Sequence, residues 1–441
     1  MNEREFWNSR DDLRYIRDYA RSKGVRVAPW ALLFTTLARL SVIVPPNVVI
    51  PAFAGGSPMG LNVFVALIGN SGDGKGLTER AARNLIPDIK DAVTTQPASG
   101  EGVASLFAKR ATDEEGHSVL ECTTSRALLS IPEITALGGT ARRVGSTVVP
   151  TLTSAYSGET LGFWNKNEGN RLQVPEYGYR LSLITGVQPA NLNVIMNEAG
   201  TGLPQRFLWA DVLDPEAPER AAHVELKPFD VSRLPASPAM HALDALYQAG
   251  SRWNMMNHGD TGYPLTCMSF PECVADAVEH DSYLRLKGQR GDSLDSHGIG
   301  VRLKLAALFA LLQQRLDVSE ADWMLADYAY GRSSGFRSEC VERARELACI
   351  NKAKGIELDD EAREQAEQVR LESVKQRILT QLDRHDPAHE GMKGYAIRRL
   401  LGNRNGSLTY RAIESLLEDG SIDRLGEDKG TSSSTWARAS Y

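Results

Sequence analysis

The sequence has few cysteines and no pair of them at a metal-binding spacing. Among 441 residues there are five, Cys122, Cys267, Cys273, Cys340 and Cys349, and none forms a Cys-x-x-Cys motif. An odd number without that motif argues against a disulfide framework and against a structural zinc site. We therefore expect five free thiols, each buried as a small apolar side chain, in the reducing cytoplasm.

The sequence also lacks an apolar run long enough to cross a membrane. The two longest runs, 30–44 and 301–312, are short or interrupted by charge, whereas a spanning helix needs about 20 apolar residues. The first residues, Met1–Glu5, are polar and carry acids, which is not the pattern of a signal peptide. These features predict a cytoplasmic protein with no membrane partner.

Neither sign of charge dominates the chain. It has 50 Lys and Arg against 56 Asp and Glu, a formal net charge of −6. This balance excludes a globally basic protein that coats nucleic acid. A local basic surface stays open, because phosphate contacts need only a few well-placed Lys and Arg. The length is sufficient for several domains, each with its own core.

Sequence patterns divide the chain into five parts. Residues 1–55 are predicted to be helical, and alternating strand and helix patterns over 56–232 predict a three-layer α/β core. Residues 233–350 are expected to be a mostly helical, lid-like domain. Residues 351–372 are predicted to be a charged connecting helix, and 373–441 a compact last domain. The clearest strands of the core are expected at Asn62–Ile68, Ala127–Ile131 and Tyr179–Thr185.

A glycine-rich loop follows the first of these strands. It reads Gly-Asn-Ser-Gly-Asp-Gly-Lys-Gly and leads into a predicted helix over 76–84. In such a P-loop the backbone N–H groups curl around a phosphate, the lysine adds a charge, and the helix N-terminus adds its dipole. The pattern favours an ATP-binding loop over a glycine-rich turn with a solvated lysine. The expected nucleotide-binding residues are Gly69, Asn70, Ser71, Gly72, Asp73, Gly74, Lys75, Gly76 and Leu77.

Gly76 stands where such loops usually have a Ser or Thr that binds Mg²⁺. The Gly-Lys-Gly sequence resembles that of nucleoside monophosphate kinases of the adenylate kinase type. That resemblance implies that Mg-ATP can be used with the metal held largely through water, and Mg²⁺ keeps several waters readily. ATP and Mg²⁺ are therefore the expected cofactors, with Thr78 a weaker candidate for a metal contact.

Three polar residues near later strands complete the expected site. Glu133 follows the second strand, where a carboxylate can polarise the attacking water or hold the metal, although Pro132 replaces the Asp that usually precedes it. Gln188 follows the third strand and could orient water beside the γ-phosphate. Arg206 precedes another apolar strand and could neutralise transition-state charge, in its own subunit or a neighbour. Each also has an ordinary structural interpretation, and Glu121 is a weaker alternative to Glu133.

The order of these motifs resembles the AAA+ helicases of the minichromosome-maintenance class and related replication proteins of phages and mobile elements. The resemblance covers about residues 60–315 and includes the trailing C-terminal domain. It implies a ring, most simply a hexamer, that hydrolyses ATP between subunits to move DNA. It also implies that Glu133 is catalytic base and metal ligand, Gln188 a sensor, and Arg206 and Arg302 arginines of the site. The motifs that carry it are Gly69–Gly76, Ile131–Glu133, Leu161–Tyr179, Val187–Pro189, Gln205–Phe207 and Val301–Leu305.

A hairpin predicted within 161–179 is one candidate DNA contact. Its centre, 165–170, is dense in turn-forming residues. If the hairpin points into a ring, Lys166 and Arg171 would meet the phosphate backbone of a threaded strand. A solvated surface hairpin is an equally good interpretation of the same residues.

Residues 373–441 have the pattern of a winged helix, with three helical segments followed by a β-ribbon around Ile422 and Trp436. This segment has 11 Lys and Arg against 9 Asp and Glu, a weakly basic balance. We expect DNA binding here, with a protein contact as the alternative. The candidates are Thr409, Tyr410 and Arg411 for base contacts, and Arg404 and Lys429 for phosphate contacts.

These patterns predict an ATP-driven, ring-forming DNA motor or replication initiator. Two alternatives stay open. A nucleoside monophosphate kinase would need a second nucleotide site and an arginine-rich lid. A non-catalytic, nucleotide-gated DNA-binding protein would be consistent with Gly76 and Pro132, which weaken the expected metal site.

Overall fold

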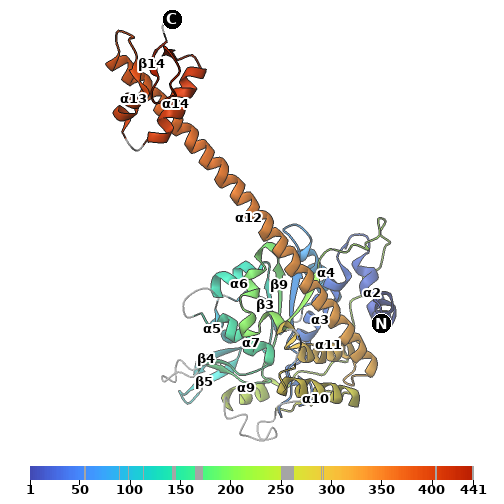
Figure 1. Ribbon diagram of the computed structural model, residues 1–441. Coiled ribbons are helices and arrows are strands. Elements are labelled where there is room, and N and C mark those ends of the chain that lie inside the picture. The colour runs from blue at the N-terminus through green and yellow to red at the C-terminus, as the bar shows by residue number, and fades with distance from the viewer. Residues whose placement is uncertain are drawn as a thin grey trace. The chain divides into compact units, whose positions relative to one another are not determined.

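The chain forms two compact units, Met1–Leu347 and Ala348–Tyr441, in the computed structural model (Figure 1). Each unit has its own hydrophobic core, and helix α12 (Glu320–His385) contributes to both. The core of the first unit includes residues from all three segments predicted between 1 and 350. The structure describes residues 1–53, 56–88, 90–97, 99–112, 114–141, 146–163, 172–249, 263–289, 291, 293–402 and 405–439.

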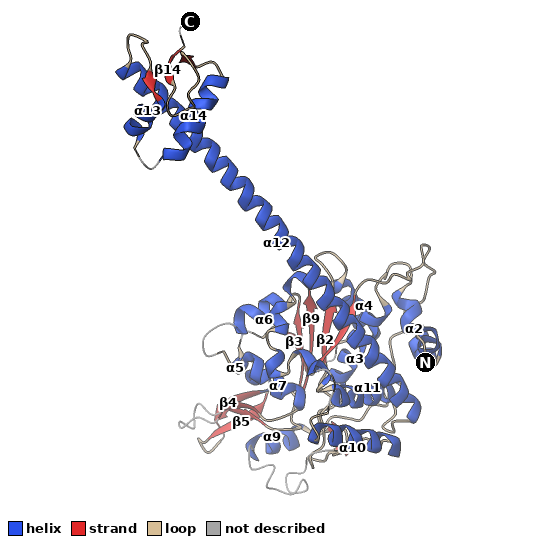
Figure 2. Cartoon of the chain, in the orientation of Figure 1, coloured by secondary structure: helices blue, strands red, loops and turns tan. Residues whose placement is uncertain are grey.

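A parallel sheet of five strands forms the centre of the first unit (Figure 2). The strand order is β10-β2-β9-β6-β3, and every pairing is parallel. Strands β2, β9 and β10 are buried along their whole length, which explains their continuous apolar sequences. The α/β core and its three clearest strands, predicted from the sequence, are confirmed. The strands are β2 (Phe64–Ile68), β3 (Ala92–Thr95), β6 (Arg126–Ile131), β9 (Arg180–Val187) and β10 (Phe207–Asp211).

The strand order places β9 between β2 and β6, although β6 precedes β9 in the chain. Ile68 at the end of β2 pairs with Val187, and Ile131 at the end of β6 pairs with Thr185. The carboxyl ends of the three strands therefore meet at one edge of the sheet, where open α/β sheets bind their ligands.

Helices cover both faces of the sheet (Figure 1). Helix α3 (Pro29–Ile43) is buried throughout and packs against the strands and against α4 (Lys75–Leu85). Helix α4 connects β2 to β3 at the far edge of the sheet, and the later connections run back across the sheet towards β10. If all crossovers are right-handed, the helices of these later connections lie on the face opposite to α4. The first-unit helices not yet given are α1 (Glu3–Asn8), α2 (Asp11–Ala20), α5 (Gly100–Phe107), α6 (Ile134–Ala141), α7 (Val148–Ser157), α8 (Asn193–Met196), α9 (Met240–Ala249), α10 (Glu272–Leu286) and α11 (Gly298–Leu312).

In the described part of the first unit, three two-stranded sheets lie outside the central sheet. Val48 and Val49, within the N-terminal region predicted to be helical, form a strand that pairs with a later strand in one of them. The hairpin predicted within 161–179 is present as an antiparallel pair, and its tip lies outside the described residues. The pairs are β1 (Val48–Val49) with β11 (Thr266–Cys267), β4 (Ala108–Thr112) with β5 (Ser118–Cys122), and β7 (Leu161–Phe163) with β8 (Leu172–Val174).

The second unit consists of three helical segments and a small antiparallel sheet of order β12-β14-β13. Its core includes Ile378, Ile397, Ile413 and Trp436. The three helical segments predicted ahead of the β-ribbon are confirmed, but the first is not separate from the connecting helix, because both belong to α12. The other elements are β12 (Met392–Lys393), α13 (Gly394–Leu401), α14 (Gly406–Glu418), β13 (Ile422–Leu425) and β14 (Thr435–Arg438).

All five cysteines are free thiols, as expected, but the expectation that all are buried is wrong. Only Cys340 is buried, whereas Cys267, Cys273 and Cys349 are exposed. Cys273 and Cys349 lie on solvent-facing positions of α10 and α12, because a helix exposes part of its surface whatever residue stands there. Among the described residues, no helix combines the length and the apolar character needed to cross a membrane.

Arg180, the first residue of β9, links residues 44–48, which follow α3, to the sheet. Its side chain is fully buried and donates hydrogen bonds to the carbonyl oxygens of Pro45 at 2.8 Å, Val48 at 2.7 Å and Val44 at 3.4 Å. Burial lowers the pKa of this guanidinium to about 9. The guanidinium therefore replaces the donors that three buried carbonyl groups would otherwise lack.

Replacing Arg180 with Met should lower the free energy of unfolding by about 2–4 kcal/mol, because buried carbonyls would lose their donors. Urea denaturation monitored by tryptophan fluorescence would measure the change. The matched control is Arg14→Met, since Arg14 is half exposed and forms an ion pair with Asp11 at the surface. A change within about 0.5 kcal/mol is expected there. Equal stability of the Arg180 variant and the wild type would contradict this account.

Candidate functional site

A glycine-rich loop joins β2 to α4 at the carboxyl edge of the sheet. Gly72 and Gly74 have φ values of 92° and 101°, a left-handed conformation that glycine adopts without steric cost. The N–H of Gly69 donates to the Val187 carbonyl at 3.1 Å, and the N–H of Asn70 donates to the Asp73 carboxylate at 2.6 Å. The loop is thus held by its own contacts and by the end of β9.

Lys75 is the first residue of α4, and its side chain folds back under the loop. Its Nζ atom donates to the carbonyl oxygens of Gly69 at 2.6 Å and Asn70 at 2.9 Å. The same ammonium group lies 3.7 Å from the Glu133 carboxylate. One positive charge therefore touches both the loop and the acid that follows β6.

Glu133 is bound by Gln188 through both carboxylate oxygens. The Gln188 backbone N–H donates to Oε1 at 3.3 Å, and its side-chain amide donates to Oε2 at 3.0 Å. The structure therefore brings Lys75, Gln188 and Glu133 together. The strand order explains why, because Gln188 follows β9, which lies between β2 and β6.

Gly186 allows this close approach. A Cβ atom at this position would lie 2.3 Å from the Pro132 carbonyl oxygen and 2.8 Å from Cε of Lys75. No side chain fits there without displacing the lysine or the end of β6. Gly186 was not among the residues predicted from the sequence, although a glycine inside a buried strand often marks close approach of another group.

A cavity of about 580 Å³ opens beside the loop. Several of its lining residues belong to α4. Three of these, Glu79, Arg80 and Arg83, were not identified from the sequence. Their helical spacing after Lys75, at four, five and eight residues, was the available signal. The lining residues are Asn70, Ser71, Gly72, Gly74, Lys75, Gly76, Leu77, Glu79, Arg80, Arg83, Pro132, Glu133 and Gln188.

Glu79 is the second carboxylate of the cavity. Its Oε2 atom accepts a hydrogen bond from the Ser130 hydroxyl at 2.6 Å. Burial raises the pKa of the Glu79 carboxyl above its ordinary value, and the hydrogen bond from Ser130 acts in the opposite direction. This side chain links α4 to β6 directly below the edge that carries Glu133.

The donor set suits a phosphate and a hard cation. The loop N–H groups and the nearby cations Lys75, Arg80 and Arg83 suit phosphate oxygens. Neither Gly76 nor Pro132 offers a side-chain oxygen, and the buried Thr78 hydroxyl donates to the Gly74 carbonyl at 3.2 Å. The structure thus disfavours Thr78 as a metal contact.

Two carboxylates at the cavity, those of Glu79 and Glu133, fit the oxygen preference of Mg²⁺. The described residues contain no group of three or more His, Cys, Asp or Glu side chains that could hold a metal alone. An ion at this place would therefore also need phosphate oxygens and water, which is how Mg²⁺ is usually bound at nucleotide sites.

Arg206 lies at the opposite edge of the sheet. It directly precedes β10, which is parallel to β2, whereas the loop follows β2. Its side chain is only 8% exposed, and Nη1 donates to the Gly202 carbonyl at 2.7 Å. Burial lowers the pKa of this guanidinium. Arg206 therefore cannot act at the cavity of its own chain in this conformation.

Arg302, on α11, is also absent from the lining of the cavity beside the loop. It donates to Asp327 at 2.9 Å and lies 5.6 Å from the centre of the Trp323 ring. Two residues later, Lys304 is fully buried and donates to the carbonyls of Asn62 at 2.9 Å and Tyr156 at 2.6 Å. Burial lowers the pKa of Lys304 well below its ordinary value. The structure thus does not bring Arg302 to the glycine-rich loop of its own chain.

Three of the predicted DNA contacts, Lys166, Arg171 and Arg404, lie outside the described residues. The prediction that Thr409 faces a base is wrong. Its side chain is fully buried, and its hydroxyl donates to the Asn405 carbonyl at 2.7 Å. The helical repeat turns this position of α14 towards the core of the second unit.

The other predicted DNA contacts lie nearer to solvent. Arg411 is exposed and forms an ion pair with Glu367, and Lys429 is exposed. Tyr410 is half-buried, with its hydroxyl 3.1 Å from the Ser432 hydroxyl. Arg411 and Lys429 are thus available for phosphate contacts, at the cost of one surface ion pair.

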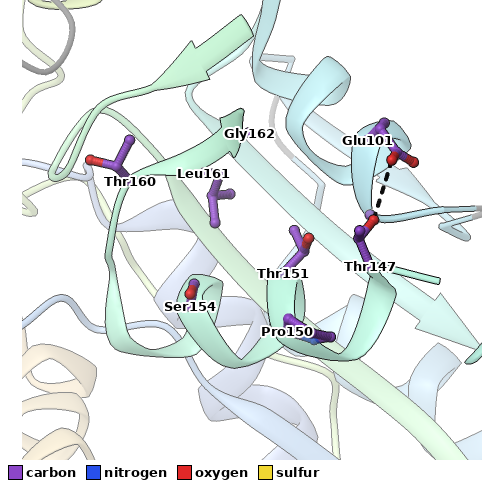
Figure 3. Close-up of a pocket in the computed structure, with 9 residues that line it drawn as sticks. Glu101, Thr147, Pro150, Thr151, Ser154, Thr160, Leu161 and Gly162 are labelled. Carbon is purple, nitrogen blue, oxygen red and sulfur yellow. Dashed lines mark hydrogen bonds between the residues drawn. The ribbon is translucent and has the colours of Figure 1, made fainter. Parts of the chain in front are cut away.

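A second cavity, of about 250 Å³, lies between α5, α7 and β7 (Figure 3). Four of its lining residues, Thr147, Thr151, Ser154 and Thr160, carry hydroxyl groups, and the Thr147 hydroxyl donates to Glu101 at 3.4 Å. No Lys or Arg is among its described lining residues, so it is a poorer match for phosphate than the cavity beside the loop. Its lining residues are Gly100, Glu101, Thr147, Pro150, Thr151, Ser154, Thr160, Leu161 and Gly162.

No protein-family model matches the chain, and the search of curated proteins found no significant match.

Proposed function

We propose that the first unit is an AAA+-like P-loop ATPase core that binds and hydrolyses Mg-ATP at the cavity beside β2. The observation that carries the proposal is the convergence of Lys75, Gln188 and Glu133 beside a loop with two left-handed glycines. Phosphoryl transfer to water needs a cation that binds the phosphates and polar groups that position and activate the water. Lys75, at the start of α4, can be the cation, and Gln188 and Glu133 can be the polar groups.

Each group has a role that follows from its chemistry. The loop N–H groups and Lys75 would bind the β- and γ-phosphates, and Gln188 would orient the attacking water through its amide. Glu133 would accept a proton from that water. Bound Mg²⁺ would neutralise phosphate charge, and Glu79 and Glu133 are the residues able to hold it.

We also propose that the second unit is a winged helix that binds DNA. The support is its fold of three helical segments with a three-stranded antiparallel sheet and its exposed cations Arg398, Arg399, Arg411 and Lys429. Together with the motif order of the first unit, this favours an ATP-driven DNA motor or replication initiator that works as a ring, most simply a hexamer. In such a ring Arg206 and Arg302 would act at the site of a neighbouring subunit.

Two variants separate nucleotide binding from turnover. Lys75→Ala should abolish ATP binding, because it removes the charge closest to the loop. Glu133→Gln should bind ATP and lose hydrolysis, because the amide keeps the shape but cannot accept the proton. Equilibrium binding of a fluorescent ATP analogue and phosphate release would measure the two effects.

The matched control for these variants is Glu121→Gln. Glu121 lies on β5, its carboxylate is 3.3 Å from the Lys109 ammonium, and it does not line the cavity. It should bind and hydrolyse ATP like the wild type. Unchanged ATP affinity of Lys75→Ala would refute the proposed nucleotide site. Phosphate transfer to AMP would favour the kinase alternative, and tight binding without turnover in the wild type would favour the non-catalytic one.

Arg206→Ala tests the ring. As a residue supplied to a neighbour, it should leave ATP binding intact and slow hydrolysis by ~10³-fold. Mixing Arg206→Ala with Lys75→Ala subunits should restore part of the turnover, since some interfaces would pair an intact loop with an intact arginine. Two results would assign a structural role to Arg206, as its hydrogen bond to the Gly202 carbonyl indicates. Mixed rings form and stay inactive, or Arg206→Ala has a clearly lower melting temperature than the wild type.

Deleting residues 373–441 should weaken DNA binding and leave basal ATP hydrolysis largely intact, because Lys75, Gln188 and Glu133 all lie in the first unit. Fluorescence anisotropy with labelled DNA would measure the loss. In the full chain, Lys429→Ala should reduce the slope of log affinity for DNA against log salt concentration by about 1, the value for one lost phosphate contact. DNA affinity that survives the deletion unchanged would assign the second unit to a protein contact instead.

A further inference from the structure

The two positions that usually bind Mg²⁺ in a P-loop site have no side-chain oxygen in this chain. Gly76 replaces a Ser or Thr, and Pro132 replaces an Asp. The Thr78 hydroxyl is buried and already bonded to the Gly74 carbonyl. If ATP binds with its metal, another oxygen must take part.

Glu79 is placed to supply that oxygen. It lies four residues after Lys75 in α4, which puts both side chains on one face of the helix. Side chains in an α-helix tilt towards its N-terminus, which here is the end next to the glycine-rich loop. The longer glutamate side chain can therefore serve the same end of the helix as the missing Ser or Thr, from one turn further along.

The carboxylate of Glu79 is oriented and has an oxygen to spare. Oε2 accepts from the Ser130 hydroxyl at 2.6 Å, and Ser130 lies on β6, three residues before Glu133, which follows this strand. Within the described residues, no donor contacts the other oxygen, Oε1. Glu79 and Glu133 line the same cavity, so two carboxylates from two different elements face the place where a metal-bound triphosphate would lie.

We propose that Glu79 is the principal protein carboxylate for nucleotide-bound Mg²⁺, directly or through one water, in place of the side chains missing at Gly76 and Pro132. The inference rests on the proposed ATP site. It agrees with the coordination that Mg²⁺ prefers, in which one or two carboxylates act together with phosphate oxygens and retained water. Ser130 is then a positioning residue, which holds the carboxylate through its hydrogen bond.

The competing explanation is structural. The bond between Glu79 and Ser130 would then only tie α4 to β6. Two variants distinguish the explanations. Glu79→Gln keeps the length and an oxygen that can accept from Ser130, but it removes the negative charge. Ser130→Ala removes the hydrogen bond and leaves the carboxylate.

The experiment measures metal affinity without turnover. Mn²⁺ binding to the full chain, saturated with a non-hydrolysable ATP analogue, is followed by electron paramagnetic resonance, and analogue affinity is measured with Mg²⁺ and with EDTA. Glu79→Gln should weaken Mn²⁺ binding by about tenfold or more and leave metal-free nucleotide affinity unchanged. Ser130→Ala should have a smaller effect on the metal, and the control Glu121→Gln none.

Three outcomes count against the inference. Unchanged Mn²⁺ affinity in Glu79→Gln, with normal nucleotide binding, overturns it and leaves the ATP site standing. Equal losses of metal affinity and melting temperature in Glu79→Gln and Ser130→Ala would assign the pair to structure and overturn it as well. If the wild type binds no nucleotide with or without metal, the proposed function itself fails, and this inference fails with it.

Discussion

The insertion of β9 between β2 and β6 is the constraint on which the candidate site depends. A parallel sheet gathers the carboxyl ends of its strands at one edge, but the strand order decides which loops become neighbours. Here the order puts Gln188 between the loop that holds Lys75 and the acid Glu133. Gly186 is part of the same constraint, because any side chain there would push β6 and the lysine apart.

The two edges of this sheet carry different kinds of polar group. At the carboxyl edge, Lys75 and Glu133 contact each other beside an open cavity. At the amino edge, the buried cations Arg180, Arg206 and Lys304 donate to backbone carbonyls. These cations supply hydrogen-bond donors to buried backbone carbonyls that would otherwise have none. The buried cations thus bind backbone within the chain, whereas Lys75 and Glu133 line an open cavity.

The sequence was informative wherever the signal is local. The strand, glycine-rich loop and helix around Lys75 are contiguous, and Glu133 and Gln188 each lie within two residues of the end of an apolar strand, so the local sequence predicted their place at one edge of the sheet. Glu79 and Gly186 were missed because their importance depends on contacts with residues far along the chain, Ser130 and Pro132. The assignment of Thr409 to a DNA-facing surface failed for a related reason. A helix pattern gives the spacing of its faces, and packing against other elements decides which face is buried.

The contacts of Glu133 have a consequence for how an ATPase built this way would work. Both carboxylate oxygens now accept from Gln188, and Lys75 lies close by. These contacts engage both carboxylate oxygens of Glu133 and also the Lys75 ammonium. Under the proposed function, a triphosphate that drew the Lys75 ammonium and the Gln188 amide to its own oxygens would free one carboxylate oxygen of Glu133. Nucleotide binding and release of the acid would then be one event, because the groups proposed to recognise phosphate are the groups that hold the acid.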